Sequence, residues 1–354
     1  MSRFFSHKYD CLTPYTPGEQ PQGRQYIKLN TNESPFPPSP LAQRLARQAV
    51  GDLQLYSDPT CRDLVSAAAQ VLGVAEDEIL FTNGSDEILN FAFMAFCDAD
   101  HPAVFPNVTY GFYPVFADLN AVPYEEIPLR EDFTVNVEDY IGIGKTIFLA
   151  NPNAPTGLAL SAAEVERIVA SNPESVVVVD EAYVDFGGES VVPLIRRYDN
   201  LLVCQTFSKS RSLAGGRLGF GVACPALIRD LNTVKYSTNP YNINRMTMAA
   251  GVGALTDTAY FRENCAKIME TRAWTTGKLR ELGFVAADSC TNFVFAKHPR
   301  ISGGELYRAL RERGVLVRHF ETPLLRDYNR ITIGSAEQME SFITILTGIL
   351  EETP

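Results

Sequence analysis

The chain has 354 residues, which is long for one ordinary hydrophobic core and predicts one large and one small domain. Hydrophobic residues make up 45% and charged residues 21% of the chain, as in soluble globular enzymes, and no apolar stretch is long enough to predict a membrane span. The net charge of −11 argues against binding of a nucleic-acid backbone, which requires a basic surface.

Signals for export, disulfides and metals are missing from the sequence. The N-terminal residues lack the apolar core and cleavage site of a signal peptide, so we expect a cytoplasmic protein. The seven cysteines are scattered without a CxxC pair, which favours reduced thiols over a disulfide framework or a zinc site. The four histidines show no metal-ligand spacing, and no GxSxG motif supports a serine hydrolase. We therefore expect no bound metal.

Residues 1–40 predict an extended N-terminal arm, because proline and glycine are frequent from residue 11 onward. Residues 41–240 predict a large domain in which short apolar runs alternate with amphipathic stretches. The strand-like runs are 79–81, 103–105, 145–150, 176–179 and 201–204. Continuous runs of β-branched residues are typical of strands buried on both faces, so we expect an α/β fold with a mostly parallel sheet. The following "RLGFGVAC" is the candidate for an antiparallel strand.

Residues 241–354 predict a smaller α+β domain. A long helix is expected over residues 254–282, followed by a strand at 292–296 and a helix at 304–314. Two strands, "VLVR" and "RITIG", and a final helix at 336–350 complete the chain. We expect the N-terminal arm to pack on this domain or on a partner subunit.

Polar side chains follow every predicted strand of the large domain. In open α/β sheets, ligands bind at the carboxyl ends of the strands. The motifs at these ends are "NGSDE" (83–87), Tyr110, "NPNAPTG" (151–157), "DEAY" (180–183) and "TFSK" (206–209). Singly, each has an ordinary explanation as a turn, a helix cap, a surface loop or a solvated lysine. Their joint order along the chain is what favours a shared site.

This ordered set, together with "SKSRSLAGGRLG", resembles the fold type I aminotransferases that use pyridoxal 5′-phosphate (PLP), over nearly the whole chain. More narrowly, "LTPY", "LNTNES", "YSDP" and "RITIG" are similar to motifs of the histidinol-phosphate aminotransferases, a class II aminotransferase family. The resemblance implies a central sheet flanked by helices, a small C-terminal α+β domain and a homodimer. The implied reaction converts L-histidinol phosphate and 2-oxoglutarate to imidazole acetol phosphate and L-glutamate, with ping-pong kinetics, in histidine biosynthesis.

The resemblance also implies roles for single residues. Lys209 would form a Schiff base with PLP and then move the substrate proton, while Asp180 would keep the pyridine nitrogen protonated. Tyr183 would donate a hydrogen bond to the ring oxygen O3′. The implied cofactor contacts are Gly84, Ser85, Asp86, Tyr110, Asn153, Asp180, Tyr183, Thr206, Ser208, Lys209 and Arg217, with Tyr56 from the partner subunit.

The chain departs from the family pattern at one position. Relatives often have asparagine directly before the proline of "PTG", where it bonds O3′, and this chain has Ala154 there. Asn153, one residue earlier, is the candidate to replace it. This departure concerns the contacts of O3′ and leaves the assignment of PLP unchanged.

The substrate site implied by the resemblance comprises Tyr15, Asn32, Arg318 and Arg330. A planar guanidinium suits a carboxylate or a phosphate, although Arg318 could equally be a solvated residue at a strand end. Two other PLP-dependent activities fit the pattern, namely transamination of aromatic amino acids and decarboxylation of a phosphorylated amino acid. A PLP-binding regulator without catalysis would need a DNA-binding domain, for which the chain has no room before residue 30. Arg211 receives no role from these arguments.

Overall fold

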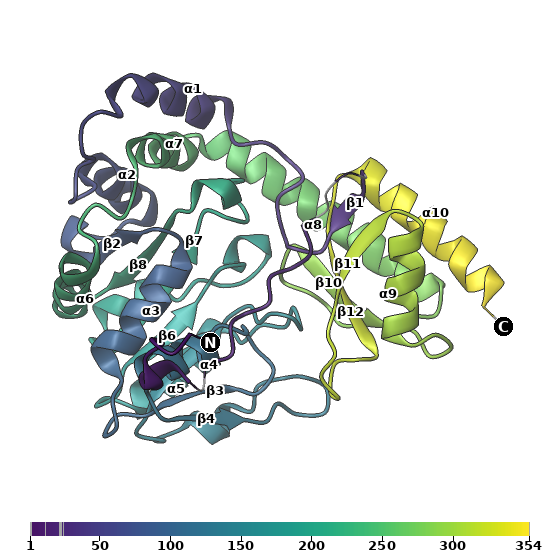
Figure 1. Ribbon diagram of the computed structural model, residues 1–354, viewed down its shortest axis with the longest axis horizontal. Helices are drawn as coiled ribbons and strands as arrows, with labels where there is room; N and C mark the ends of the chain where they lie inside the picture. The colour runs from purple at the N-terminus through teal and green to yellow at the C-terminus, as the bar shows by residue number, and fades with distance from the viewer. Residues whose placement is uncertain (1, 11, 21–22, 24, 354) are drawn as a thin grey trace.

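We describe the protein from a computed structural model, which covers residues 2–10, 12–20, 23 and 25–353. Met1, Cys11 and a few positions of the predicted arm lie outside the described residues. Two β-sheets, each covered by helices, form the two parts of the molecule (Figure 1). No helix within the described residues is long and apolar enough to cross a bilayer.

The larger sheet has seven strands and is mostly parallel. In spatial order its strands are β2 (Ile79–Thr82), β8 (Gly219–Ala223), β7 (Leu201–Thr206), β6 (Val177–Asp180), β5 (Thr146–Ala150), β3 (Ala103–Pro106) and β4 (Tyr124–Ile127). Within this sheet, β8 runs antiparallel to both of its neighbours, as expected for "RLGFGVAC". The α/β fold predicted from the sequence is confirmed. The edge strand β4 was not predicted, because most of its side chains are exposed and it carries no apolar run.

Helices cover both faces of this sheet. They are α1 (Pro40–Ala49), α2 (Arg62–Leu72), α3 (Ser85–Phe96), α4 (Tyr113–Asn120), α5 (Ala162–Ser171), α6 (Pro225–Thr238) and α7 (Arg245–Thr256). In β6, Val177 and Val179 belong to one hydrophobic core, whereas Val178 belongs to another on the opposite face. Both faces of the strand are therefore buried, which explains its run of valines.

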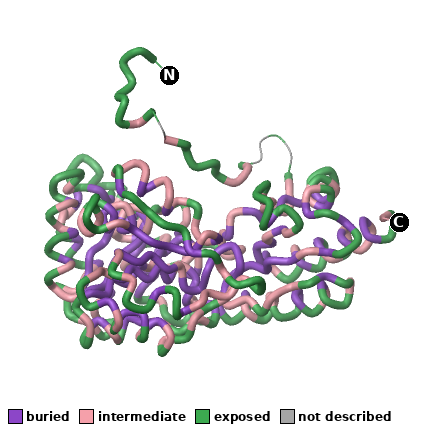
Figure 2. The backbone as a smooth tube through the Cα atoms, turned by 90° about the horizontal axis from the view of Figure 1, so that it is seen from below, coloured by how far each residue is buried: buried purple, intermediate pink, exposed green. Residues whose placement is uncertain are grey.

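The smaller sheet has five strands and is mostly antiparallel. Its order is β1 (Ile27–Leu29), β11 (Val315–His319), β12 (Tyr328–Thr332), β10 (Phe293–Lys297) and β9 (Val285–Ala286). Three helices share a hydrophobic core with this sheet: α8 (Thr258–Glu281), α9 (Gly303–Glu312) and α10 (Ala336–Glu352). The strand β1 comes from the predicted arm and pairs in parallel with β11. Figure 2 shows the buried backbone concentrated in the two parts, while the described residues before β1 are largely exposed.

Short 3₁₀ turns connect these elements. They are η1 (His7–Tyr9), η2 (Val50–Asp52), η3 (Glu76–Glu78), η4 (Val137–Tyr140), η5 (Val184–Phe186), η6 (Val192–Arg196) and η7 (Ala214–Gly216). Several helices begin at a serine that accepts a hydrogen bond from the backbone three residues later, as at Ser161, Ser302 and Ser335. These capping boxes fix the helix starts locally.

The helix predicted over residues 254–282 corresponds to α8, but residues 254–256 belong to the end of α7. Asp257 separates the two helices, because its side chain accepts a hydrogen bond from Tyr260 N and caps the start of α8. The preceding helix α7 packs on α1, where a Cβ at Gly253 would lie 2.5 Å from Ala42 Cα. A domain boundary near Asp257 fits this packing better than the predicted one at residue 240. The division into 1–40, 41–240 and 241–354 stays a prediction.

Candidate active site

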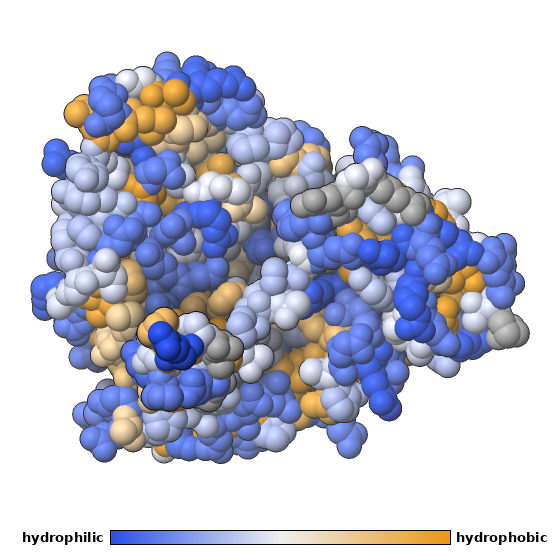
Figure 3. Space-filling view, in the orientation of Figure 1, coloured by the Kyte–Doolittle hydropathy of each residue, from blue (hydrophilic) through white to orange (hydrophobic). Residues whose placement is uncertain are grey.

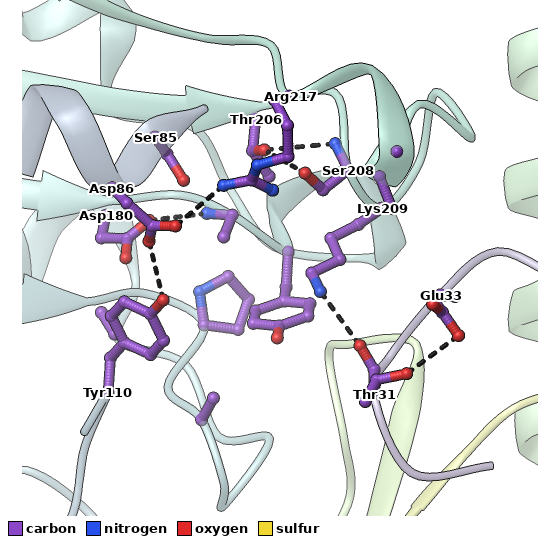
Figure 4. Close-up of a pocket in the computed structure, with 17 residues that line it drawn as sticks. Thr31, Glu33, Ser85, Asp86, Tyr110, Asp180, Thr206, Ser208, Lys209 and Arg217 are labelled. Atoms are coloured by element: carbon purple, nitrogen blue, oxygen red, sulfur yellow. Dashed lines mark hydrogen bonds and ion pairs between the residues drawn. The ribbon is translucent and has the colours of Figure 1, made fainter. Parts of the chain in front are cut away.

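The carboxyl ends of β2, β5, β6 and β7 meet at a cavity of about 350 Å³ (Figure 4). The predicted site residues that line it are Ser85, Asp86, Tyr110, Asp180, Tyr183, Thr206, Ser208, Lys209 and Arg217. Thr31 and Glu33, from the segment after β1, also line it and were not predicted. Their only signal in the sequence is the motif "LNTNES" that contains them. The strand-end motifs therefore converge on one cavity.

One end of this cavity is suited to an anion. Helix α3 begins there at Ser85, after Gly84 with a φ of +81°, so free backbone N–H groups stand at its start. The hydroxyls of Thr206 and Ser208 lie 3.1 Å apart beside them. The guanidinium of Arg217 completes this end and forms an ion pair with Asp86 at 2.9 Å. Helix dipole, hydroxyls and guanidinium together make a site for a phosphate.

The close approach of β8 to the start of α3 requires glycine at position 219, because a Cβ there would lie 2.3 Å from Ser85 N. We expect Gly219→Ala to destabilise the fold by about 1–3 kcal/mol through overpacking, measured as the free energy of unfolding in urea. Gly215→Ala is the matched control, since a Cβ at Gly215 meets nothing within 4 Å. Equal stabilities of the two variants would contradict the close approach.

Asp180 is a buried carboxylate without a cationic partner among the described residues. It is 5% exposed and accepts hydrogen bonds from Ala182 N at 3.2 Å and from the Tyr113 hydroxyl at 3.4 Å. Burial raises the pKa of this carboxyl to about 7, and the nearby charge of Asp86 adds to the shift. A protonated ring nitrogen placed in the cavity would supply the missing positive charge.

Lys209 presents its amine to the same cavity. Its Nζ donates to Thr31 O at 3.3 Å and lies 5.7 Å from the centre of the Tyr183 ring. Within the part of the chain that the structure describes, Lys209 forms no ion pair. An amine held only by a carbonyl can condense with an aldehyde, so the donors of the cavity fit PLP as the sequence predicted.

Of the two tyrosines predicted to contact the cofactor from outside the strand ends β6 and β7, one lines the cavity and the other does not. Tyr110 lines the cavity, and its hydroxyl donates to Asp86 at 2.7 Å. Burial raises the pKa of the Tyr110 phenol well above its usual value. Tyr56 is 79% exposed outside this cavity and stacks on Tyr241 at 4.6 Å. Its predicted contact with cofactor would have to be made in another copy of the chain.

The structure does not bring Asn153 into the cavity. Its Nδ2 donates to Val108 O at 2.9 Å and to Thr156 Oγ1 at 3.1 Å, and its Oδ1 accepts from Thr109 Oγ1 at 2.8 Å. Its amide thus holds the surrounding loop together. Ala154 lines the cavity in its place and offers only a methyl group, so Asn153 cannot make the predicted contact in this arrangement.

A larger groove of about 740 Å³ adjoins the cavity and shares Tyr110, Tyr183 and Lys209 with it. The predicted substrate residues all line this groove: Tyr15, Asn32, Arg318 and Arg330. The described part of the arm runs along it, since Arg318 donates to Thr16 O at 3.3 Å.

The two arginines of the groove stand opposite each other. Arg318 on β11 and Arg330 on β12 are register partners across the strands. Burial lowers the pKa of the Arg330 guanidinium, and its Nε is buried without a hydrogen-bond partner in the described residues. Two adjacent like charges and an unpaired donor favour an anionic ligand, which would relieve the repulsion and use the free N–H group.

Comparison with known proteins agrees with this geometry. The family model of class I and II aminotransferases matches residues 24–346. The chain is 49% identical over 353 residues to histidinol-phosphate aminotransferase 1 of Bordetella parapertussis, with 99% of each chain covered. It is 46% identical over 353 residues to the histidinol-phosphate aminotransferase of Brachyspira hyodysenteriae, with 99% of this chain and 100% of the relative covered.

A solved structure shares the fold. The crystal structure of histidinol-phosphate aminotransferase from Sinorhizobium meliloti in complex with pyridoxal-5′-phosphate superposes with a TM-score of 0.90 at 24% identity. The match covers 100% of this chain and 99% of that chain. At this identity the likeness speaks for the fold.

Proposed function

Because the chain belongs to the family of class I and II aminotransferases, we propose that it transfers the amino group of L-histidinol phosphate to 2-oxoglutarate, with PLP as its cofactor. The products are imidazole acetol phosphate and L-glutamate, a step of histidine biosynthesis. One geometric observation carries this choice of substrate. The Lys209 amine lies between two sites for anions, so that a phosphate of the cofactor and a phosphate of the substrate are both accommodated.

The chain's own residues divide the work in this proposal. Bound in the cavity, PLP supplies an aldehyde that condenses with amines and a ring that withdraws electrons from the substrate Cα. Ser208, Arg217 and the start of α3 hold its phosphate, and Asp180 pairs with its ring nitrogen. Lys209 would take the proton from the substrate Cα as a general base and deliver it to C4′ of the cofactor as a general acid. Tyr183 donates to the ring oxygen.

The arginine pair should determine the preference for a phosphorylated substrate. We expect Arg318→Ala to lower kcat/KM for L-histidinol phosphate by about 10- to 100-fold, since hydrogen bonds to charged groups contribute about 1.5–3 kcal/mol. The kcat/KM for L-histidinol, which lacks the phosphate, should change much less. Initial-rate assays with both substrates measure this difference. The exposed Arg326→Ala removes the same charge outside the groove and serves as the control.

A substrate panel on the purified, PLP-loaded protein tests the function as a whole. Higher kcat/KM for L-histidinol phosphate than for L-phenylalanine, without release of carbon dioxide, is the expected result. The opposite ratio would indicate an aromatic-amino-acid aminotransferase, and carbon dioxide would indicate a decarboxylase of a phosphorylated amino acid. A protein that binds PLP but is inert with every amino donor would contradict catalysis altogether. The relatives do not favour these alternatives.

An exposed apolar segment supports the proposed homodimer. Leu53 and Leu55 are 51% and 57% exposed, and they precede the exposed Tyr56 between α1 and α2. Figure 3 shows apolar surface at the end of the molecule where α1 lies. Arg245 donates to Leu55 O and to Tyr56 O, which holds this segment in place. A second copy that covers it would receive Tyr56 as the predicted phosphate ligand. The cytoplasmic location stays a prediction.

A further inference from the structure

Asn32 lies between β1 and α1 with both atoms of its side-chain amide engaged. It is 1% exposed and has a φ of +55°, a conformation that asparagine tolerates better than most residues. Its Oδ1 accepts a hydrogen bond from Thr332 Oγ1 at 2.9 Å, and its Nδ2 lies 2.8 Å from the Tyr183 hydroxyl. Asn292 Nδ2 donates to Asn32 O at 3.0 Å and fixes the backbone. This residue therefore joins the smaller sheet to the cavity.

The hydrogen bonds around Thr332 determine which way the amide of Asn32 points. Thr332 is buried, its Oγ1 accepts a hydrogen bond from Asn32 N at 3.0 Å, and Asn32 Oδ1 is the one acceptor that the described residues offer to its own proton. A flipped amide would leave this buried proton without a partner, so the amide oxygen faces Thr332. The Nδ2 group is then the one that faces Tyr183. An amide N–H can only donate, so the Tyr183 oxygen accepts from Asn32.

As a result, the proton of the Tyr183 hydroxyl stays available for a hydrogen bond. In the described residues, its hydroxyl has no acceptor for that proton, and its ring is held edge-on against Phe293 at 5.2 Å. Because the Asn32 bond occupies one side of the oxygen, the O–H group remains to donate toward a ligand in the cavity. A hydroxyl that accepts a hydrogen bond is also a stronger donor.

The Tyr183 hydroxyl is important as a donor because the neighbouring wall of the cavity offers no side-chain amide. Ala154 lines it beside Tyr183, and the amide of Asn153 is bonded elsewhere. We propose that Asn32 is a positioning residue for transamination, which fixes the Tyr183 hydroxyl as donor to the ring oxygen of the cofactor and compensates for the methyl group of Ala154. This inference rests on the proposed PLP-dependent function.

The pH titration of the visible absorption band of lysine-bound PLP tests this inference. Without a strong donor, the ring oxygen of PLP becomes more basic. It then holds more strongly the proton that it shares with the nitrogen between Lys209 and PLP, and the pKa of this nitrogen rises. We expect Asn32→Ala to raise the midpoint of this titration by about one pH unit. Two charged groups face Tyr183, the Lys209 amine and the Arg330 guanidinium, and the variant keeps both. A loss of packing alone would not move this midpoint.

A double-mutant cycle shows whether Asn32 acts through Tyr183. In the Tyr183→Phe background, Asn32→Ala should add no further shift, because the hydroxyl that it positions is already missing. Asn32→Asp should raise the midpoint as Asn32→Ala does, since a carboxylate at this place takes the Tyr183 proton for itself. Asn30→Ala is the matched control, because Asn30 Nδ2 bonds Glu19 O and does not contact Tyr183. It should leave the midpoint unchanged.

Two results would overturn the inference. One is a wild-type midpoint for Asn32→Ala while Tyr183→Phe shifts it, and the other is an equal shift by Asn32→Ala in both backgrounds. Thr332→Val, which removes the partner of Asn32 Oδ1 but keeps the size of the side chain, provides the test if Asn32→Ala does not fold. It should raise the midpoint in the same direction. A wild-type protein that gains no visible band with PLP would instead defeat the proposed function.

Discussion

Replacing Lys209 with alanine is expected to lower the rate of transamination by about 10⁴-fold or more, because the variant loses both the nucleophile and the proton carrier. Lys209 is the only lysine among the described residues that line the cavity, so no other amine can take its place. Single-turnover mixing of the PLP-loaded protein with L-histidinol phosphate measures the rate. The visible band of lysine-bound PLP should also be lost.

The effect should belong to the amine itself. Added ethylamine should restore part of the rate of Lys209→Ala, since a small amine can enter the space left by the side chain. Lys28→Ala removes a neighbouring amine that contacts Thr31 and Glu33, and it should change the rate by less than about tenfold. A rate for Lys209→Ala close to that of the wild type would disprove the assignment.

Asp180→Asn should have the second-largest effect on catalysis. Removing one partner of a buried ion pair costs about 3–5 kcal/mol, which corresponds to a fall in kcat/KM of about 10²- to 10⁴-fold. Glu181→Gln is the control, because Glu181 is equally buried next to Asp180 but lies outside the cavity lining and bonds Gln205. Its kcat/KM should stay within about tenfold of the wild type. A near wild-type rate for Asp180→Asn would mean that another group faces the ring nitrogen.

The same substitution should stabilise the PLP-free protein at high pH. The pKa of Asp180 rises from 3.8 to about 7 on folding, so between these values the folded state binds a proton that the unfolded state does not. The contribution of Asp180 to the free energy of unfolding is fully present below pH 3.8, its pKa in the unfolded chain. This contribution is lost as the pH rises from there through about 7. Asparagine removes the loss, which is on the order of 4 kcal/mol at about pH 8. Urea unfolding should show a larger gain at about pH 8 than at about pH 5, where only part of the loss has occurred.

Strands with continuous apolar runs could be predicted from the sequence, because both of their faces are buried. The run that forms β6 is the clearest example. By contrast, β1 has only three residues in a stretch rich in proline, and its partner β11 lies near the other end of the chain. The break between α7 and α8 depends on one capping residue, Asp257, within a continuous helical pattern. Such features depend on distant or very local contacts that periodicity does not encode.

The residues at the strand ends were predictable for a similar reason, since the topology of a parallel sheet brings its carboxyl ends together. The direction in which each side chain points could not be predicted. Nothing in "NPNAPTG" shows that Asn153 turns into its own loop, and the orientation of the Asn32 amide depends on Thr332, which is 300 positions away in the sequence. The fold and the part of the lining that comes from the strand ends could be predicted from patterns, whereas Thr31, Glu33 and the hydrogen bonds of the site depend on contacts between segments far apart in the sequence.

The parallel pairing of β1 with β11 links the beginning of the chain to its last part during synthesis. Ile27–Leu29 leave the ribosome early, but their ladder can form only after Val315–His319 has been translated. The larger sheet, whose strands end at Ala223, can assemble before that. A fragment that starts at residue 241 would leave the edge of β11 open to intermolecular pairing. The smaller part of this enzyme is therefore expected to be obtained in a stable form only with the N-terminal segment supplied, in the same chain or as a separate peptide.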